Sequence, residues 1–324
     1  MKSYKELYTL IEQEIAGLKY EQQPAELYQP IRYMLSLGGK RLRPAMLLMA
    51  SELFGGDVKQ AVPAALAIEM FHNFTLVHDD IMDNAAIRRN QPTVHTKWNQ
   101  TVAILSGDLM MIKALDLLCE TQTDNLRGLI SVFNKAAAEV CEGQQWDMNF
   151  EQQDDITEYE YLNMITLKTA VLLGCSLKLG ALIAKADKND AEHLYEFGKN
   201  IGIAFQIQDD ILDSFGEKDK VGKKIGGDIA SNKKTLLLIE ALNNATPSLK
   251  EELKHWLAQA NDENDAKINA VLAIYEKCNV RTKAEQLKEH YLQTAFKHLH
   301  ALSTGEEKAV VIKQMAIDLM ERIS

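Results

Sequence analysis

Two acidic motifs of the same form could do chemistry, because each collects three aspartates within six residues. The first is HDDIMD at residues 78–83, and the second is QDDILD at residues 208–213. Carboxylates crowded in this way repel one another unless cations hold them together. A set of ligands made only of oxygen suits Mg²⁺, Mn²⁺ or Ca²⁺, whereas zinc prefers histidine or cysteine. The motifs therefore predict divalent-cation sites.

Each motif closes an apolar helical segment, where acidic side chains face the unfavourable negative end of the helix dipole. Side chains four residues apart lie about 40° apart around a helix, so Asp79 and Asp83 can reach one metal cluster. By the same spacing Asp209 and Asp213 form the opposing pair, while Asp80 points elsewhere and supports the first pair. Mg²⁺ usually takes one or two protein carboxylates and completes its shell with water and phosphate oxygens. The implied ligand is a polyphosphate bridged between two acidic helix ends.

Basic side chains that could hold such a ligand occur in several short segments. They are Lys40, Arg41 and Arg43 in GGKRLRP, Arg88 and Arg89 after the first acidic motif, Lys168 in LKTA, Lys223 and Lys224 after the second, and Lys233 in SNKKT. GGKRLRP is not a nucleotide-binding P-loop, because it has neither the GxxxxGK[ST] pattern nor a preceding strand.

Composition narrows the class of protein. The chain has 324 residues, 46% hydrophobic and 25% charged, and a formal net charge of −10. This charge argues against nucleic acid or an anionic membrane as a partner. The most apolar run, TAVLLGCSLKLGALIA, is interrupted by Lys178, and the N-terminus has no secretory h-region, so we expect no membrane span. Four scattered cysteines without metal-site spacing predict free thiols in a reducing, cytoplasmic location.

Helical periodicity recurs along almost the whole chain and predicts an all-α protein of about a dozen helices. No segment shows sustained strand alternation, and no linker divides the chain, so we expect a single domain over residues 1–324. The predicted helices are 3–19, 25–36, 43–54, 61–82, 100–119, 125–149, 158–183, 190–214, 233–243, 248–260, 264–277, 279–301 and 305–322.

Taken together, these segments resemble the trans-isoprenyl diphosphate synthases, also called polyprenyl synthetases. The resemblance covers nearly the whole chain and rests on order and spacing. Its segments are GGKRLRP (38–44), FHNFTLVHDDIMD (71–83), IRRNQPTVH (87–95), SGDLM (106–110), GQQWD (143–147), LKTA (167–170), FQIQDDILD (205–213), GKKIGGDI (222–229) and NKKT (232–235). It implies an isoprenoid-synthase helical bundle around a central cavity, usually a homodimer. It also implies a reaction that joins isopentenyl diphosphate head to tail to an allylic diphosphate (dimethylallyl, geranyl or farnesyl).

The resemblance also implies roles for individual residues. Asp79, Asp83 and Asp209 resemble the ligands of about three Mg²⁺ ions that the substrate diphosphate completes, with Asp80 and Asp213 in support and Mn²⁺ as the alternative metal. The allylic diphosphate would be held by Arg88, Lys168, Lys223 and Lys233, and isopentenyl diphosphate by Lys40, Arg43, His72 and Arg89. Thr169 and Gln206 match positions beside the reacting carbons.

The implied chemistry is ionisation, condensation and elimination, and it accounts for these residue types. Loss of the allylic diphosphate leaves a carbocation and a highly charged leaving group, which metal ions and basic side chains stabilise without a nucleophile. The double bond of isopentenyl diphosphate attacks the cation, and the departing diphosphate takes the proton. The backbone at Lys168 and Thr169, together with Gln206, would offer dipoles to the cation in a water-poor pocket.

Product length depends on side chains that lie one or two turns below Asp79, since an isoprene unit extends about one helical turn, about 5.4 Å. Helix geometry selects Thr75 and Phe71, and the resemblance points to Phe74. Phe74 beside the small Thr75 is typical of short-chain synthases, and we expect a geranylgeranyl (C20) product. Farnesyl diphosphate (C15) is the alternative.

Two other functions compete with this one. A class I terpene cyclase shares the first acidic motif but needs neither GGKRLRP, nor Arg89, nor a second DDxxD. A regulatory subunit of a hetero-oligomeric prenyl synthase would be expected to lose an acidic motif or basic ligands, and this chain has lost none.

Overall fold

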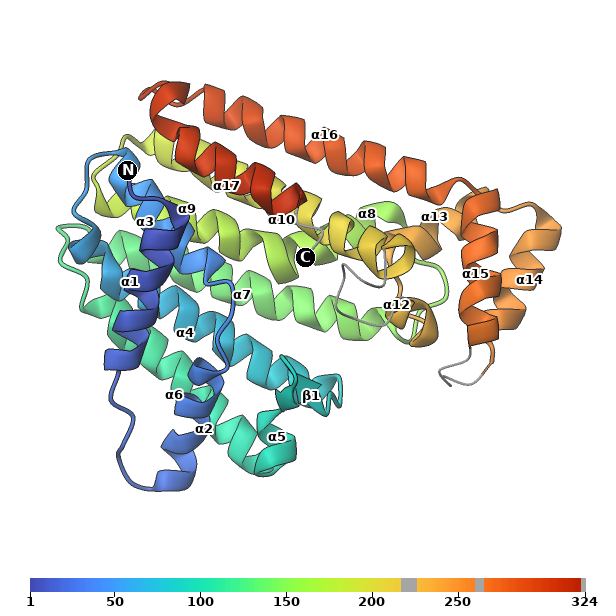
Figure 1. The fold of residues 1–324 in the computed structure, drawn as a ribbon, viewed down its shortest axis with the longest axis horizontal. Helices are drawn as coiled ribbons and strands as arrows, with labels where there is room; N and C mark the ends of the chain where they lie inside the picture. The colour runs from blue at the N-terminus through green and yellow to red at the C-terminus, as the bar shows by residue number, and fades with distance from the viewer. Residues whose placement is uncertain (217–225, 260–264, 322–324) are drawn as a thin grey trace. The chain divides into compact units, whose positions relative to one another are not determined.

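The computed structural model describes residues 1–216, 226–259 and 265–321 (Figure 1). Helices make up almost all of the regular structure in these ranges, which confirms the prediction of an all-α fold. The exception there is a small antiparallel hairpin of β1 (Ile87–Arg88) and β2 (Gln91–Pro92). Arg89 and Asn90 form its turn with φ of 51° and 60°. Two positive φ values characterise a type I′ turn, and strands this short leave no alternating pattern in the sequence.

The chain divides into two compact units. Unit 1 comprises Met1–Ala136, Leu172–Tyr195 and Ala301–Ile312, and unit 2 comprises Ala137–Val171, Glu196–His300 and Lys313–Ser324. This division leaves the expected single domain over 1–324 as a prediction. Four helices have residues in both units: α7 (Leu126–Phe150), α9 (Val171–Ile183), α10 (Lys188–Phe215) and α17 (Val310–Glu321).

Unit 1 is built around α4, which contributes more buried residues than any other helix in the N-terminal part of the unit. The helices of this N-terminal part are α1 (Tyr4–Gly17), α2 (Ala25–Ser36), α3 (Leu42–Leu53), α4 (Val58–Met82), α5 (Val94–Lys97) and α6 (Gln100–Cys119). Residues such as Ala64, Ile68 and Phe71 of α4 are almost completely buried. Helix α6 runs beside α4 (Figure 1). Gly107 permits this approach, because a Cβ there would lie 2.5 Å from Cδ2 of His78.

Unit 2 has its own hydrophobic core, which gathers side chains from short and long helices alike. These include α8 (Glu158–Ile165), α12 (Gly227–Ala230), α13 (Leu236–Asn244), α14 (Pro247–Leu257), α15 (Asp265–Lys277) and α16 (Val280–His300). Tyr161, Ile207, Leu237 and Val271 are buried together in this core. The core lies against the segment that carries the second acidic motif, because Ile207 and Ile211 belong to both.

Two predicted helices include a turn of a different helical type, and another begins later than predicted. Predicted helix 158–183 is interrupted by a π-helical turn, η1 (Thr166–Ala170), between α8 and α9. Predicted helix 305–322 begins with a 3-10 turn, η2 (Glu306–Ala309). Predicted helix 233–243 begins only at Leu236, because the Thr235 side chain accepts the N–H of Leu238 at 3.5 Å and caps the helix there.

One described helical stretch, Glu158–Ile183, is long and apolar enough to span a membrane by length and composition. Its most apolar window is 67% buried within the protein. A buried core helix of a soluble protein has the same length and composition, so this stretch is weak evidence for a membrane span.

Candidate functional site

The first acidic motif lies at the C-terminal end of α4. Asp83 is the C-cap residue, and its N–H donates to the carbonyl oxygen of Asp79 at 2.8 Å. Asp79 is half-buried and Asp83 is exposed, and the two residues lie one helical turn apart. This is the arrangement that the spacing predicts.

Asp80 differs from its two neighbours because it is 1% exposed and already paired. Nε of Arg88 donates to both oxygens of the Asp80 carboxylate at 2.9 Å, and Nη2 lies 2.8 Å from one of them. Burial raises the pKa of Asp80, and Arg88 acts in the opposite direction. Asp80 is thus placed to hold Arg88 beside the acidic motif, in keeping with the supporting role expected of it.

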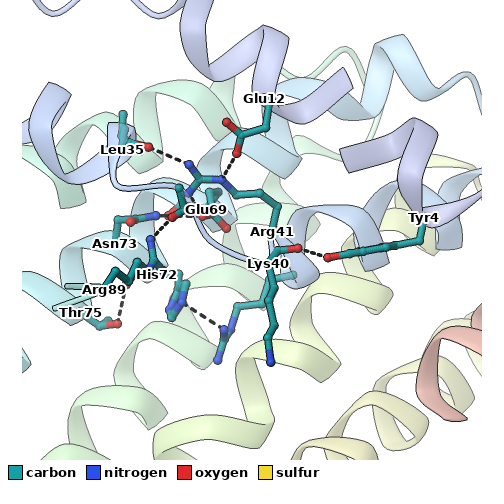
Figure 2. Close-up of polar contacts among 12 residues, drawn as sticks. Tyr4, Glu12, Leu35, Lys40, Arg41, Glu69, His72, Asn73, Thr75 and Arg89 are labelled. Carbon is teal, nitrogen blue, oxygen red and sulfur yellow. Dashed lines mark hydrogen bonds and ion pairs between the residues drawn. The ribbon is translucent and has the colours of Figure 1, made fainter. Parts of the chain in front are cut away.

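The residues expected at the isopentenyl diphosphate site gather in unit 1. Nη1 of Arg43 donates to Nε2 of His72 at 3.2 Å, and the guanidinium of Arg89 donates to the carbonyl oxygen of Gly38. Gly39, at φ 144°, lies against Arg89, and a Cβ there would sit 2.9 Å from Nη2. Lys40 is exposed on the same loop (Figure 2). The structure therefore brings residues 38–43, which we call the basic loop and which lead into α3, together with α4.

Electrostatics keep His72 neutral. Burial lowers its pKa well below the ordinary value, and the positive charges of Arg43, Arg89, Arg88 and Arg41 act in the same direction. A neutral ring that accepts from Arg43 at Nε2 carries its proton on Nδ1. Burial lowers the pKa of Arg43 to about 10, so its guanidinium remains charged at neutral pH.

This depressed pKa gives a testable pH dependence. The unfolded chain binds a proton at residue 72 below about pH 6.5 that the folded protein excludes, so the free energy of unfolding falls as the pH drops. The contribution has a slope of up to about 1.4 kcal/mol per pH unit. In urea titrations between pH 6.5 and 5, His72→Gln is expected to lose stability less steeply than the unsubstituted chain. Exposed His290→Gln is the control, and equal slopes for all three proteins would contradict the assignment.

Lys168 and Thr169 lie in the π-helical turn η1 of unit 2. π-helical turns inside α-helices occur frequently at functional sites. Nζ of Lys168 lies 2.6 Å from Oδ2 of Asp147, and both side chains are largely but not fully buried. Gly143 of α7 packs directly under the turn, because a Cβ there would meet the backbone of Lys168 and lie 2.7 Å from the carbonyl carbon of Leu167.

Substituting Gly143 tests whether this close packing sets the position of Lys168. Gly143→Ala forces rigid backbone apart, so we expect a loss of about 1–3 kcal/mol in the free energy of unfolding and a marked fall in kcat. Denaturant unfolding and steady-state kinetics measure the two effects. Gly17→Ala is the control, because a methyl group there meets no atom within 4 Å. Equal stability and activity in the two variants would refute the packing argument.

The second acidic motif repeats the arrangement of the first. Asp209 is exposed, whereas Asp210 is 3% exposed. Asp210 accepts hydrogen bonds from the hydroxyl of Tyr161 and from Nε2 of Gln206 at 3.3 Å. Burial raises the pKa of Asp210 to about 7. Asp213 accepts the backbone N–H of Asp228 at 2.9 Å, so one of its oxygens caps α12.

Four residues predicted from the sequence line one pocket of unit 2. They are Lys168, Thr169, Gln206 and Lys233, and Asp210 completes the polar wall. Oγ1 of Thr169 lies 3.5 Å from Oε1 of Gln206, at the limit of a hydrogen bond. Lys233 lies 3.9 Å from a carboxylate oxygen of Asp228. Lys223 lies outside the residues that the structure describes.

The candidate chain-length residues lie on α4 and have different surroundings. Phe71 is completely buried and packs edge-on against Phe133, with ring centroids 5.3 Å apart. Phe74 is half-buried and contacts His78 at a centroid distance of 4.8 Å. The hydroxyl of Thr75 donates to the carbonyl oxygen of His72 at 2.8 Å, which turns it back onto its own helix.

Tyr161, Asp210 and Glu69 have no role assigned from the sequence, whereas Asp147 belongs to the GQQWD segment of the resemblance. Asp147, Tyr161 and Asp210 hold Lys168 and Gln206 in unit 2, and Glu69 binds the basic loop in unit 1. The position of Asp210 inside the second acidic motif was a usable signal. No sequence pattern marks Tyr161 or Glu69, because each acts through a partner that is distant in the sequence.

Comparison with known proteins identifies the family of this chain. The polyprenyl synthetase family profile matches residues 24–275. A geranylgeranyl diphosphate synthase of Saccharolobus solfataricus is 43% identical over 82% of this chain and 77% of its own length. A geranylgeranyl pyrophosphate synthase of Geoglobus acetivorans is 37% identical over 98% of both chains. A crystal structure of a geranylgeranyl pyrophosphate synthase superposes with a TM-score of 0.94 at 43% identity, covering 100% of both chains. The chain therefore belongs to the polyprenyl synthetase family and is a trans-prenyltransferase.

Proposed function

We propose that the chain condenses isopentenyl diphosphate with allylic diphosphates, head to tail, and releases geranylgeranyl diphosphate. The observation that carries this proposal is the pocket of unit 2, in which Lys168, Thr169, Gln206 and Lys233 come together. The related synthases named above support the C20 product, and the large half-buried Phe74 favours a short chain. Farnesyl diphosphate is the alternative product.

Mg²⁺ is the proposed metal, and Asp79, Asp83 and Asp209 are its proposed ligands. No group of three or more acidic, histidine or cysteine side chains is assembled for a metal within residues 1–216, 226–259 and 265–321. Pairs of accessible carboxylates fit Mg²⁺, which takes few protein ligands and needs substrate phosphates to complete its shell. Bound there, the metal would neutralise negative charge that develops on the leaving diphosphate.

Isopentenyl diphosphate is proposed to bind at the basic loop, where Lys40, Arg43 and Arg89 supply positive charge. Nε of Arg43 is buried and has no hydrogen-bond partner within the described part of the chain, so a donor is available there for a ligand. Neutral His72 accepts from Arg43 and offers its Nδ1–H as a further donor. A diphosphate carries enough acceptor oxygens to satisfy these donors.

The allylic diphosphate is proposed to bind Arg88, Lys168, Lys223 and Lys233. Asp80 and Asp147 hold the first two of these side chains in place, which limits the reorganisation needed when substrate arrives. Thr169 and Gln206 would direct their oxygen dipoles toward positive charge on the allylic carbons. The departing diphosphate is proposed to take the proton that is lost after the new carbon–carbon bond forms.

A homodimer is part of the proposal, as is a cytoplasmic location. Helix α6 leaves large apolar side chains in solvent, with Ile104 41%, Leu105 54% and Ile112 56% exposed. Leu105 and Ile112 are seven residues apart and thus share one face of the helix. Contiguous exposed apolar surface is typical of an interface between proteins. A second copy of the chain is the proposed partner, and light scattering of the purified protein tests it.

The deciding experiment supplies the purified chain with radiolabelled isopentenyl diphosphate and each allylic primer in turn, with Mg²⁺ or with EDTA. We expect Mg²⁺-dependent C20 product from the dimethylallyl, geranyl and farnesyl primers. Accumulation of C15 identifies a farnesyl diphosphate synthase. Hydrocarbon release from an allylic diphosphate alone identifies a terpene cyclase, and no product from the isolated chain identifies a regulatory subunit.

A further inference from the structure

Arg41 stands between Lys40 and Arg43 in the basic loop, yet it points into the protein. It is 2% exposed. Its Nε donates to Glu12 at 2.6 Å, Nη1 to Glu69 at 2.6 Å, and Nη2 to the carbonyl oxygen of Leu35 at 2.7 Å (Figure 2). Every nitrogen of the guanidinium therefore has a protein acceptor, so this side chain is engaged in holding the loop.

Two of the contacts to the loop come from the N-terminal helix α1. Glu12 binds Arg41, and the hydroxyl of Tyr4 donates to the backbone carbonyl oxygen of Lys40 (Figure 2). A third, from Glu69, comes from α4, one turn before His72 on the same helix, and a fourth is the carbonyl oxygen of Leu35 in α2. The loop is thus held by α1, α2 and α4.

The backbone at Arg41 explains why such contacts are needed. Its φ is 44°, in the left-handed region that side chains with a Cβ rarely adopt. This conformation persists only where surrounding contacts enforce it. Because Lys40 precedes Arg41 and Arg43 follows it by two residues, the direction of the chain at Arg41 sets where both basic side chains lie.

Docking of α1 does not depend on the polar contacts. Leu7, Ile11 and Ile15 form its buried apolar stripe, and a capping box between Ser3 and Glu6 stabilises its first turn. Tyr4 and Glu12 lie eight residues apart on a neighbouring, half-buried stripe. Substitutions that remove only their polar atoms should therefore leave the helix in place.

We propose that α1 positions the basic loop for the binding of isopentenyl diphosphate. Glu12 acts through Arg41, and Tyr4 acts through the Lys40 carbonyl. Both are positioning residues, and neither touches substrate. The inference rests on the proposed binding of isopentenyl diphosphate at Lys40 and Arg43. Helix α1 precedes residues 24–275, the range that the family profile matches, so Tyr4 and Glu12 lie outside that match.

The test uses Glu12→Gln and Tyr4→Phe in the full chain: the first removes the negative charge that faces Arg41, the second removes the hydrogen bond to the Lys40 carbonyl, and neither changes the shape of the side chain much. The controls are exposed Glu14→Gln, which removes the same charge from the same helix, and Tyr8→Phe, which removes the same atom from the neighbouring ring. We expect KM for isopentenyl diphosphate to rise about five- to twentyfold, since the ion pair of Glu12 or the hydrogen bond of Tyr4 no longer holds the loop ready for the binding step. kcat and KM for the allylic primer should stay within about twofold of the unsubstituted values, because uniform binding is removed without loss of transition-state interactions.

Lys40→Ala separates failure of this inference from failure of the proposed site. If Lys40→Ala leaves KM for isopentenyl diphosphate unchanged, the site itself is wrong. If Lys40→Ala raises KM but Glu12→Gln and Tyr4→Phe match their controls, the site stands and the role of α1 is refuted. A parallel loss of kcat, both KM values and thermal stability in Glu12→Gln and Tyr4→Phe would show general destabilisation and also refute the positioning role.

Discussion

Asp79→Ala and Asp209→Ala are each expected to lower kcat for Mg²⁺-dependent condensation by about a thousandfold or more, a change in the activation free energy of about 4 kcal/mol. Each substitution removes a proposed carboxylate ligand of Mg²⁺, and with it the metal's stabilisation of negative charge that would develop only as the allylic diphosphate departs. Asp79 is half-buried and Asp209 is exposed, so neither substitution leaves a cavity in a core. Steady-state kinetics over a range of Mg²⁺ concentrations measure the effect.

The matched control is Asp154→Ala, which removes an exposed aspartate from the loop between α7 and α8. Circular dichroism of all three variants should show the unsubstituted helical content. The metal assignment is refuted if Asp79→Ala or Asp209→Ala turns over at a near-normal rate. A large loss in Asp154→Ala as well would mean that net charge, rather than metal binding, governs the rate.

The helices could be predicted from the sequence because apolar positions recur at helical spacing in almost every element. Predicted helices 25–36 and 100–119 end at the observed residues, Ala25–Ser36 and Gln100–Cys119. Turns of another helical type within these α-helices were not predicted. The π-helical turn at Thr166–Ala170 packs against Gly143, which is distant in the sequence, so no local pattern marks it.

The candidate site shows the same contrast between local patterns, which can be read in the sequence, and tertiary contacts, which cannot. Spacing and motifs predict acidic and basic site residues, and the structure places Lys168, Thr169 and Gln206 around one pocket. These patterns could not indicate which charged side chains are held by other residues of the protein. Arg41 and Lys40 are neighbours in one basic run, yet one is 2% exposed and the other faces solvent. The difference arises from Glu12 and Glu69, whose proximity depends on the tertiary fold.

Phe74→Ala is expected to lengthen the product beyond C20, because the phenyl ring lies on α4 in the turn below Asp79, where a growing chain would meet it. Removing it opens a length of about one helical turn, about 5.4 Å, which is the span of about one isoprene unit. Phe74 is half-buried, so the loss of stability should be smaller than for a core phenylalanine. Mass spectrometry of the products made from a farnesyl primer measures the change.

Phe71→Ala is the contrasting variant, because Phe71 is completely buried against Phe133 and belongs to the core of unit 1. Its truncation should cost about 3–5 kcal/mol in the free energy of unfolding. A longer product from Phe74→Ala with intact thermal stability would separate a role in chain length from a role in packing. An unchanged product from a fully active Phe74→Ala enzyme would refute the assignment and leave Thr75 or a deeper residue as the stop.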